Sequence, residues 1–157
     1  MWIFDKGVII PTSFRLLIEM EFKKVLVPVS GSQADEEAMR LACRLAKKDK
    51  GKIWAVSVVA IKRALPLDAE IDSEIRNAES VLDRVESIVE EEDYEVETDI
   101  IQAREAGPAI VDEAVERGVD LILMGVTYKQ HFGQFSLGNV VPFVLKNSPC
   151  PVILYQQ

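Results

Sequence analysis

The segment that decides the fold reads Leu121-Ile122-Leu123-Met124-Gly125, then a polar loop, then Gly138-Asn139-Val140, and finally Pro151-Val152-Ile153-Leu154-Tyr155. Its first run predicts a buried strand that ends at Gly125, and its second a helix that opens at the tight turn of Gly138. Such a helix start carries unpaired N–H groups and the positive end of the helix dipole, where phosphate can bind. A strand end and a helix start with no ligand between them remain the simpler interpretation of the spacing.

The rest of the chain alternates short apolar runs with amphipathic stretches. Strands are expected at 25–29, 53–59, 96–101, 121–125 and 152–155. Helices are expected from a capping box at 32–35 to Gly51, over 71–89, from Gly107-Pro108 to Gly118, and from Gly138 onward. This order predicts an α/β fold in which helices cover both faces of a mostly parallel sheet.

Composition limits the class of protein. The chain has 157 residues, 48% of them hydrophobic and 28% charged, as in one ordinary globular domain. Its formal net charge of −8 argues against nucleic acid and anionic membranes as partners. A bound nucleotide would therefore need a metal ion or local positive dipoles. Cys43 and Cys150 form no disulfide framework, which fits a cytoplasmic protein.

The first nineteen residues are treated as an N-terminal extension of uncertain status, and residues 20–157 as the domain. Charged residues and Pro11 interrupt the apolar content of 1–19, so this leader resembles neither a membrane span nor a signal peptide. Met20 directly precedes the first clear strand, and we hypothesise that it is the original start. If the leader belongs to the protein, its apolar residues must pack on the domain or on a partner.

Open α/β sheets bind ligands beyond the carboxyl ends of their strands, where the strand order reverses. Two loops of the sequence have a suitable character for such a site. One is Ser30-Gly31-Ser32 after the first strand, and the other runs from Gly125 to Gly138 after the fourth. Both loops line one crevice if the first and fourth strands are neighbours.

Several motifs together resemble the universal stress protein family over residues 22–155. They are Val25-Leu26-Val27-Pro28-Val29-Ser30-Gly31-Ser32, Gly107-Pro108-Ala109, Asp120-Leu121-Ile122-Leu123-Met124-Gly125 and Ser148-Pro149-Cys150-Pro151-Val152. The resemblance implies an open five-stranded parallel sheet in the order 3-2-1-4-5, of the nucleotide-binding α-hydrolase-like kind. It also implies a homodimer that pairs through the last strand, here Val152-Ile153-Leu154-Tyr155.

One branch of that family resembles an ATP-binding module with the pattern G-x2-G-x9-G-[S/T] after the fourth strand. Gly125 and Gly138 match the first and third glycines, whereas Tyr128 and Asn139 replace the second glycine and the final Ser/Thr. Ser30 replaces the aspartate that the family carries after the first strand. The sequence therefore resembles the ATP-binding pattern with three departures.

Each departure has a physical consequence. Tyr128 brings a side chain where glycine permits positive φ, at a cost of roughly 1 kcal/mol or more if that conformation is needed. The Ser30 hydroxyl is a weaker acceptor for ribose hydroxyls than a carboxylate. Asn139 can cap the helix or donate its amide to a phosphate. Lys129 and His131 could add positive charge, although solvated or packed side chains are the simpler interpretation of both.

No motif predicts rapid catalysis. A Walker loop is absent, the paired acids of a response-regulator receiver are missing, and neither Cys43 nor His131 has a nucleophile or metal signature around it. We therefore expect no catalytic or metal-binding residues, and at most slow ATP hydrolysis.

Two functions fit the sequence. The first is a regulatory protein that binds ATP or another adenine nucleotide, with Mg²⁺, in the crevice between the first and fourth strands. Its expected binding residues are Pro28, Ser30, Val58, Gly125, Tyr128, Gly138, Asn139 and Val140. The alternative is a dimeric stress-response interaction module that binds no nucleotide, with Tyr128 and Phe132 filling the crevice.

Overall fold

The computed structural model describes residues 2–5, 8–11, 20–68, 71–127, 129–131, 134–136 and 138–156. Its strands are β1 (Trp2–Asp5), β2 (Val8–Pro11), β3 (Lys24–Pro28), β4 (Lys52–Ala60), β5 (Glu97–Ala103), β6 (Leu121–Val126), β7 (Lys129–His131), β8 (Gln134–Ser136) and β9 (Val152–Gln156). Its helices are α2 (Gln33–Asp49), α3 (Asp72–Glu91), α4 (Ala106–Arg117) and α5 (Val140–Asn147). The helices and parallel strands expected from the sequence are all present, with ends shifted by one or two residues.

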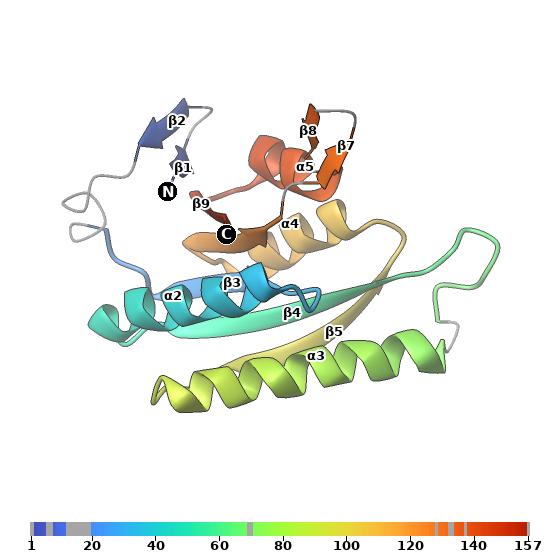
Figure 1. Ribbon diagram of the computed structural model, residues 1–157, viewed down its shortest axis with the longest axis horizontal. Helices are drawn as coiled ribbons and strands as arrows, with labels where there is room; N and C mark the ends of the chain where they lie inside the picture. The colour runs from blue at the N-terminus through green and yellow to red at the C-terminus, as the bar shows by residue number, and fades with distance from the viewer. Residues whose placement is uncertain are drawn as a thin grey trace.

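The central sheet runs in the order β2-β1-β9-β6-β3-β4-β5. Strands β5, β4, β3, β6 and β9 pair in parallel and reproduce the predicted order 3-2-1-4-5. Helices α2 and α3 cover one face of these strands, and α4 and α5 cover the other (Figure 1). The predicted α/β fold is confirmed, and β3 and β6 are neighbours as the crevice between them requires.

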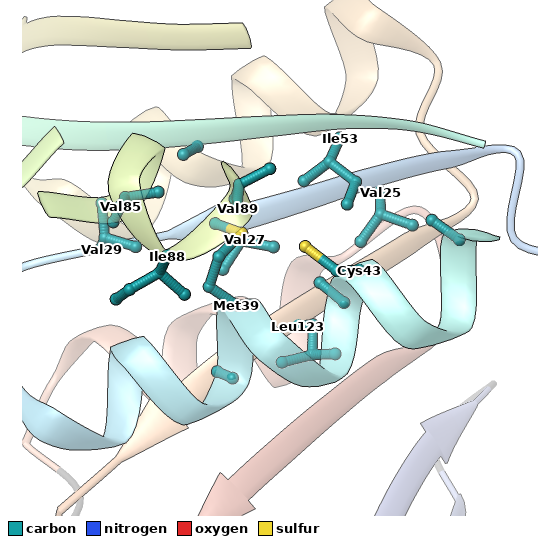
Figure 2. Packing of buried hydrophobic residues seen from close by; sticks show 14 of the residues in the cluster. Val25, Val27, Val29, Met39, Cys43, Ile53, Val85, Ile88, Val89 and Leu123 are labelled. Atoms are coloured by element: carbon teal, nitrogen blue, oxygen red, sulfur yellow. The ribbon is translucent and has the colours of Figure 1, made fainter. Parts of the chain in front are cut away.

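Strand β3 lies at the centre of the core. Val25, Leu26 and Val27 are all fully buried, because side chains of successive residues enter opposite faces of the covered sheet. Val25 and Val27 pack with Met39 and Cys43 of α2, as Figure 2 shows. Leu26 belongs to the second cluster, with α4 and α5. Burying one such side chain stabilises the fold by about 1.5–3 kcal/mol.

The ends of α2 follow from local chemistry. The Ser32 side chain accepts a hydrogen bond from the Asp35 N–H, and the Asp35 carboxylate accepts one from the Ser32 N–H, which completes the predicted capping box. At the other end, the left-handed residue is Lys50 and not the predicted stop, Gly51. Gly51 is required for another reason, since a Cβ there would lie 2.1 Å from the carbonyl oxygen of Phe22.

Two antiparallel hairpins were not predicted as elements. Strands β1 and β2 pair with each other, and β1 also pairs with the outer edge of β9, with Trp2 opposite Leu154 and Phe4 opposite Val152. Strand β1 thus lies beside β9 (Figure 1). Strands β7 and β8 form a separate two-stranded sheet within the loop expected to be irregular. The domain boundary at residue 20 stays a prediction.

Gly125 lies inside β6, where the strand passes under the first turn of α2. A Cβ at this position would lie 2.4 Å from the carbonyl carbon of Ala34 and 2.6 Å from the backbone nitrogen of Asp35. Both atoms belong to the helix backbone and cannot rotate away. The glycine is therefore explained by helix packing without any ligand.

We expect Gly125→Ala to destabilise the protein by about 3 kcal/mol, because the added methyl overpacks the contact between β6 and α2. Gly118→Ala is the matched control, since Gly118 has φ +59° and open space around its missing Cβ. The control should lose only about 1 kcal/mol, from backbone strain. Urea unfolding of both variants measures the difference, and equal losses would contradict the packing argument.

Removing residues 1–19 takes away β1 and leaves the outer edge of β9 unpaired. An unpaired edge strand is a template for pairing with another chain. We expect residues 20–157 alone to self-associate more strongly than the full chain, as measured by size-exclusion chromatography with light scattering. Leu154→Lys in the shortened chain should reduce the association, because edge charges oppose strand pairing. A shortened chain that associates no more than the full one would show that β1 does not protect this edge.

Candidate functional site

A cavity of about 190 Å³ lies at the carboxyl ends of β3, β4 and β6, beside the first turns of α4 and α5. Five of the eight residues predicted to bind nucleotide line it. The described residues that line it are Pro28, Val29, Ser30, Asp35, Val56, Val58, Ala106, Ile110, Met124, Gly125, Val140 and Val141. Residues from five separate segments of the sequence thus meet where the parallel strands end.

The walls of this cavity are mostly apolar. Val56, Ile110, Met124 and Val141 are buried side chains of the second core cluster, so the cavity is continuous with a packed interior. Among the lining residues only Ser30 and Asp35 have polar side chains. Apolar walls with a few fixed polar groups are typical of small-molecule sites.

The polar part of the wall is the turn between β3 and α2. Here the Asp35 carboxylate oxygen Oδ2 accepts hydrogen bonds from the backbone N–H groups of Ser30 at 2.8 Å and of Gly31 and Ser32 at 3.1 Å. It also accepts a hydrogen bond from the Ser30 hydroxyl, with 3.1 Å between Oγ and Oδ2. Asp35 is only 5% exposed. Four partners on one buried carboxylate hold the turn in a single conformation.

Asp35 is the functional candidate that the sequence analysis missed. Its position three residues after Ser32 was explained in full by the capping box, so no further role was assigned to it. The available signal was the combination of a carboxylate in the capping box with a site predicted at the same turn.

Gly138 and Asn139 precede α5 and do not line the cavity. Gly138 has φ +70°, which explains the glycine as a turn residue. Asn139 stands at the N-cap position of α5, but its side chain makes no capping hydrogen bond. Asn139 already has helical backbone angles instead of the extended ones of a capping residue, and Pro142 at the third helical position has no N–H to offer.

The predictions for Tyr128 and Phe132 lie outside the described residues. Lys129 and His131 belong to β7, whose backbone alone is described.

The two cysteines lie away from this cavity. Cys43 lies on the buried face of α2, where desolvation raises the pKa of its thiol to about 11. Burial also raises the pKa of Cys150 above its usual value. Both thiols therefore stay protonated at neutral pH and are poor nucleophiles.

The acidic end of α3 forms ion pairs with α2. The Glu91 carboxylate forms an ion pair with the Arg40 guanidinium at 2.9 Å. The Glu92 carboxylate lies 3.5 Å from the guanidinium groups of both Arg40 and Arg44 of α2. These ion pairs join the two helices on one face of the sheet. Within the described part of the chain no group of three His, Cys, Asp or Glu residues could hold a metal ion.

A larger cavity, about 640 Å³, lies at the opposite, amino-terminal ends of β4 and β5. Three lysines and three acidic residues contribute to its lining, and its charges are already matched in part. Lys47 donates to the Glu92 carbonyl at 3.1 Å, and Lys52 forms an ion pair with Glu97. We place the candidate site in the smaller cavity, since ligands of open α/β sheets bind at the carboxyl ends.

None of the described helices is long and apolar enough to cross a membrane.

Comparison with known proteins gives the family. The model of the universal stress protein family matches residues 21–156. The universal stress protein MJ0531 of Methanocaldococcus jannaschii is 30% identical over 142 residues, which cover 87% of this chain and 83% of that protein. Among solved structures, the fold matches the universal stress protein of Archaeoglobus fulgidus in complex with dAMP, at 23% identity and a TM-score of 0.69 over 87% and 99% of the two chains. It also matches a family protein of Arabidopsis thaliana with AMP bound, at 18% identity and a TM-score of 0.64 over 86% and 92%. The chain belongs to the universal stress protein family.

Proposed function

We propose that this protein is a regulator that binds an adenine nucleotide in the cavity between β3 and β6. The observation that carries the proposal is the meeting of five predicted binding residues, from four segments of the chain, in one cavity. Two proteins of the same fold hold dAMP and AMP, which supports the class of ligand. The two free cysteines fit action in a reducing cytoplasm.

The lining suggests how the nucleotide lies. Pro28 and Val58 present apolar surface to the base, and Ser30 and Asp35 form the polar wall beside the sugar. A volume of about 190 Å³ is below the roughly 300–1,000 Å³ of cavities that enclose a whole ligand. The phosphates would then lie at the mouth, toward the N–H groups that open α5. Mg²⁺ on those phosphates would reduce the repulsion from a chain of net charge −8.

Nucleotide binding would act by changing contacts between copies of the chain or with a protein partner. The alternative, an interaction module without nucleotide, is favoured by one specific observation. Among the described residues that line the cavity, the only ionisable side chain is the carboxylate of Asp35, whose charge repels phosphate. Binding must therefore be measured with ligands that differ in phosphate charge.

Calorimetric titration with AMP and with Mg-ATP tests the proposal. We expect micromolar binding by the natural chain and at least tenfold weaker binding by Val58→Phe, because the larger ring fills the space of the base. A factor of ten is about 1.4 kcal/mol of binding free energy. Val115→Phe is the matched control, since Val115 is 62% exposed on α4 and should leave the affinity unchanged.

Absence of binding by the natural chain at millimolar AMP and Mg-ATP would reject the nucleotide regulator and leave the interaction module. Equal affinities of the natural chain and Val58→Phe would show that nucleotide binds elsewhere on the molecule.

A further inference from the structure

We propose that Asp35 is the specificity-determining residue for the sugar, and that its carboxylate accepts hydrogen bonds from the ribose hydroxyls of the bound nucleotide. This inference rests on the nucleotide-binding function proposed above. It assigns the sugar contact to Asp35 in the first turn of α2, and not to Ser30 in the turn that follows β3.

The burial of Asp35 is the first argument. Only two polar or charged residues of the described chain are buried, Asp35 and Ser57. A buried carboxylate costs several kcal/mol unless hydrogen bonds compensate it. Here four hydrogen bonds to Oδ2 compensate that cost. The carboxylate is therefore held in one position at the wall of the cavity.

The distribution of hydrogen bonds is the second argument. Every hydrogen bond that the described residues make to this carboxylate ends on Oδ2. No polar side-chain atom of the described residues is buried without a partner, so Oδ1 reaches solvent-accessible space. Asp35 lines the candidate cavity, and on its other side it lines a second cavity of about 190 Å³ between α2 and α3. One oxygen holds the turn, and the other keeps its lone pairs for a ligand.

The hydroxyl of Ser30 has a different role from the one expected. It donates to Asp35 Oδ2 at 3.1 Å, so its proton is committed to the carboxylate. Ser30 therefore positions Asp35. The Ser30 oxygen can still accept a hydrogen bond, but it is neutral, and the carboxylate of Asp35 is the stronger acceptor at this end of the cavity.

The chemistry of an ionised carboxylate selects the part of the ligand that it contacts. It only accepts hydrogen bonds and repels phosphate oxygens, whereas the vicinal hydroxyls of ribose are two adjacent donors. The sugar should therefore lie at the turn between β3 and α2, with the phosphates directed away from it. A site built to bind hydroxyl groups discriminates against analogues that lack them.

Calorimetric titration with AMP and with 2′,3′-dideoxy-AMP tests the assignment in the full-length chain. We expect the natural chain to bind AMP at least tenfold more tightly than the dideoxy analogue. In Asp35→Asn this ratio should fall to about two or less, because the amide NH₂ that replaces the free oxygen is a donor and cannot accept hydrogen bonds from the ribose hydroxyls. The ratio separates recognition from folding, since a loss of stability alone weakens both ligands equally.

Ser32→Ala is the matched control. It removes the other half of the same capping box, but Ser32 does not line the candidate cavity. We expect a lower melting temperature and an unchanged ratio of affinities. If Asp35→Asn does not fold, Asp35→Glu keeps a carboxylate at the capping-box position and moves its oxygens by one methylene. We expect the ratio to fall in that variant as well.

The outcomes are distinct. The role of Asp35 would be overturned if the natural chain bound AMP and the dideoxy analogue with nearly equal affinity. It would also be overturned if a folded Asp35→Asn or Asp35→Glu variant kept the natural ratio of the two affinities. Both results would leave nucleotide binding intact. No binding of either ligand by the natural chain would overturn the proposed function, and this inference with it.

Discussion

The Asp35 carboxylate fixes the turn between β3 and α2, and the rest of the site depends on that turn. Three backbone N–H groups and one hydroxyl converge on a single oxygen, so the chain leaves the central strand in one direction only. Helix α2 then starts so close to β6 that only glycine fits at position 125. The same turn forms the polar wall of the cavity. A single buried charge thus determines the helix position and the character of the site.

The parallel core could be predicted because its signals are local. The apolar run at Val25 needs burial on both faces, and the ends of helices carry their own markers, such as the capping box at Ser32 and the left-handed Gly118. The hairpins could not be predicted in this way. Strand β1 pairs with β9, and a pairing between the two ends of the chain has no local signature. Gly51 illustrates the same limit, since its need for glycine comes from a distant carbonyl of Phe22.

The predicted site residues divide according to the physics behind them. Ser30, Val58 and Val140 could be expected to meet, because the carboxyl ends of neighbouring parallel strands and the following helix starts share one edge of the sheet. Gly125 and Gly138 are weaker indicators of a ligand site than their spacing suggested. Gly125 is explained by its contact with α2, and Gly138 by its positive φ. The glycine spacing therefore locates the crevice, but it does not by itself require a ligand there.

The proposed function requires a connection between the cavity and a surface that other chains can contact, and the ladder between β6 and β9 joins the cavity to the edge of the sheet. Gly125 lines the cavity and lies opposite Tyr155 in this parallel pair. The next residue of β9, Leu154, lies opposite Trp2 of the N-terminal hairpin. Met124, which also lines the cavity, lies opposite this same Leu154. One residue of β9 therefore separates the cavity wall from the strand that covers the edge of the sheet, and the backbone ladder is continuous between them.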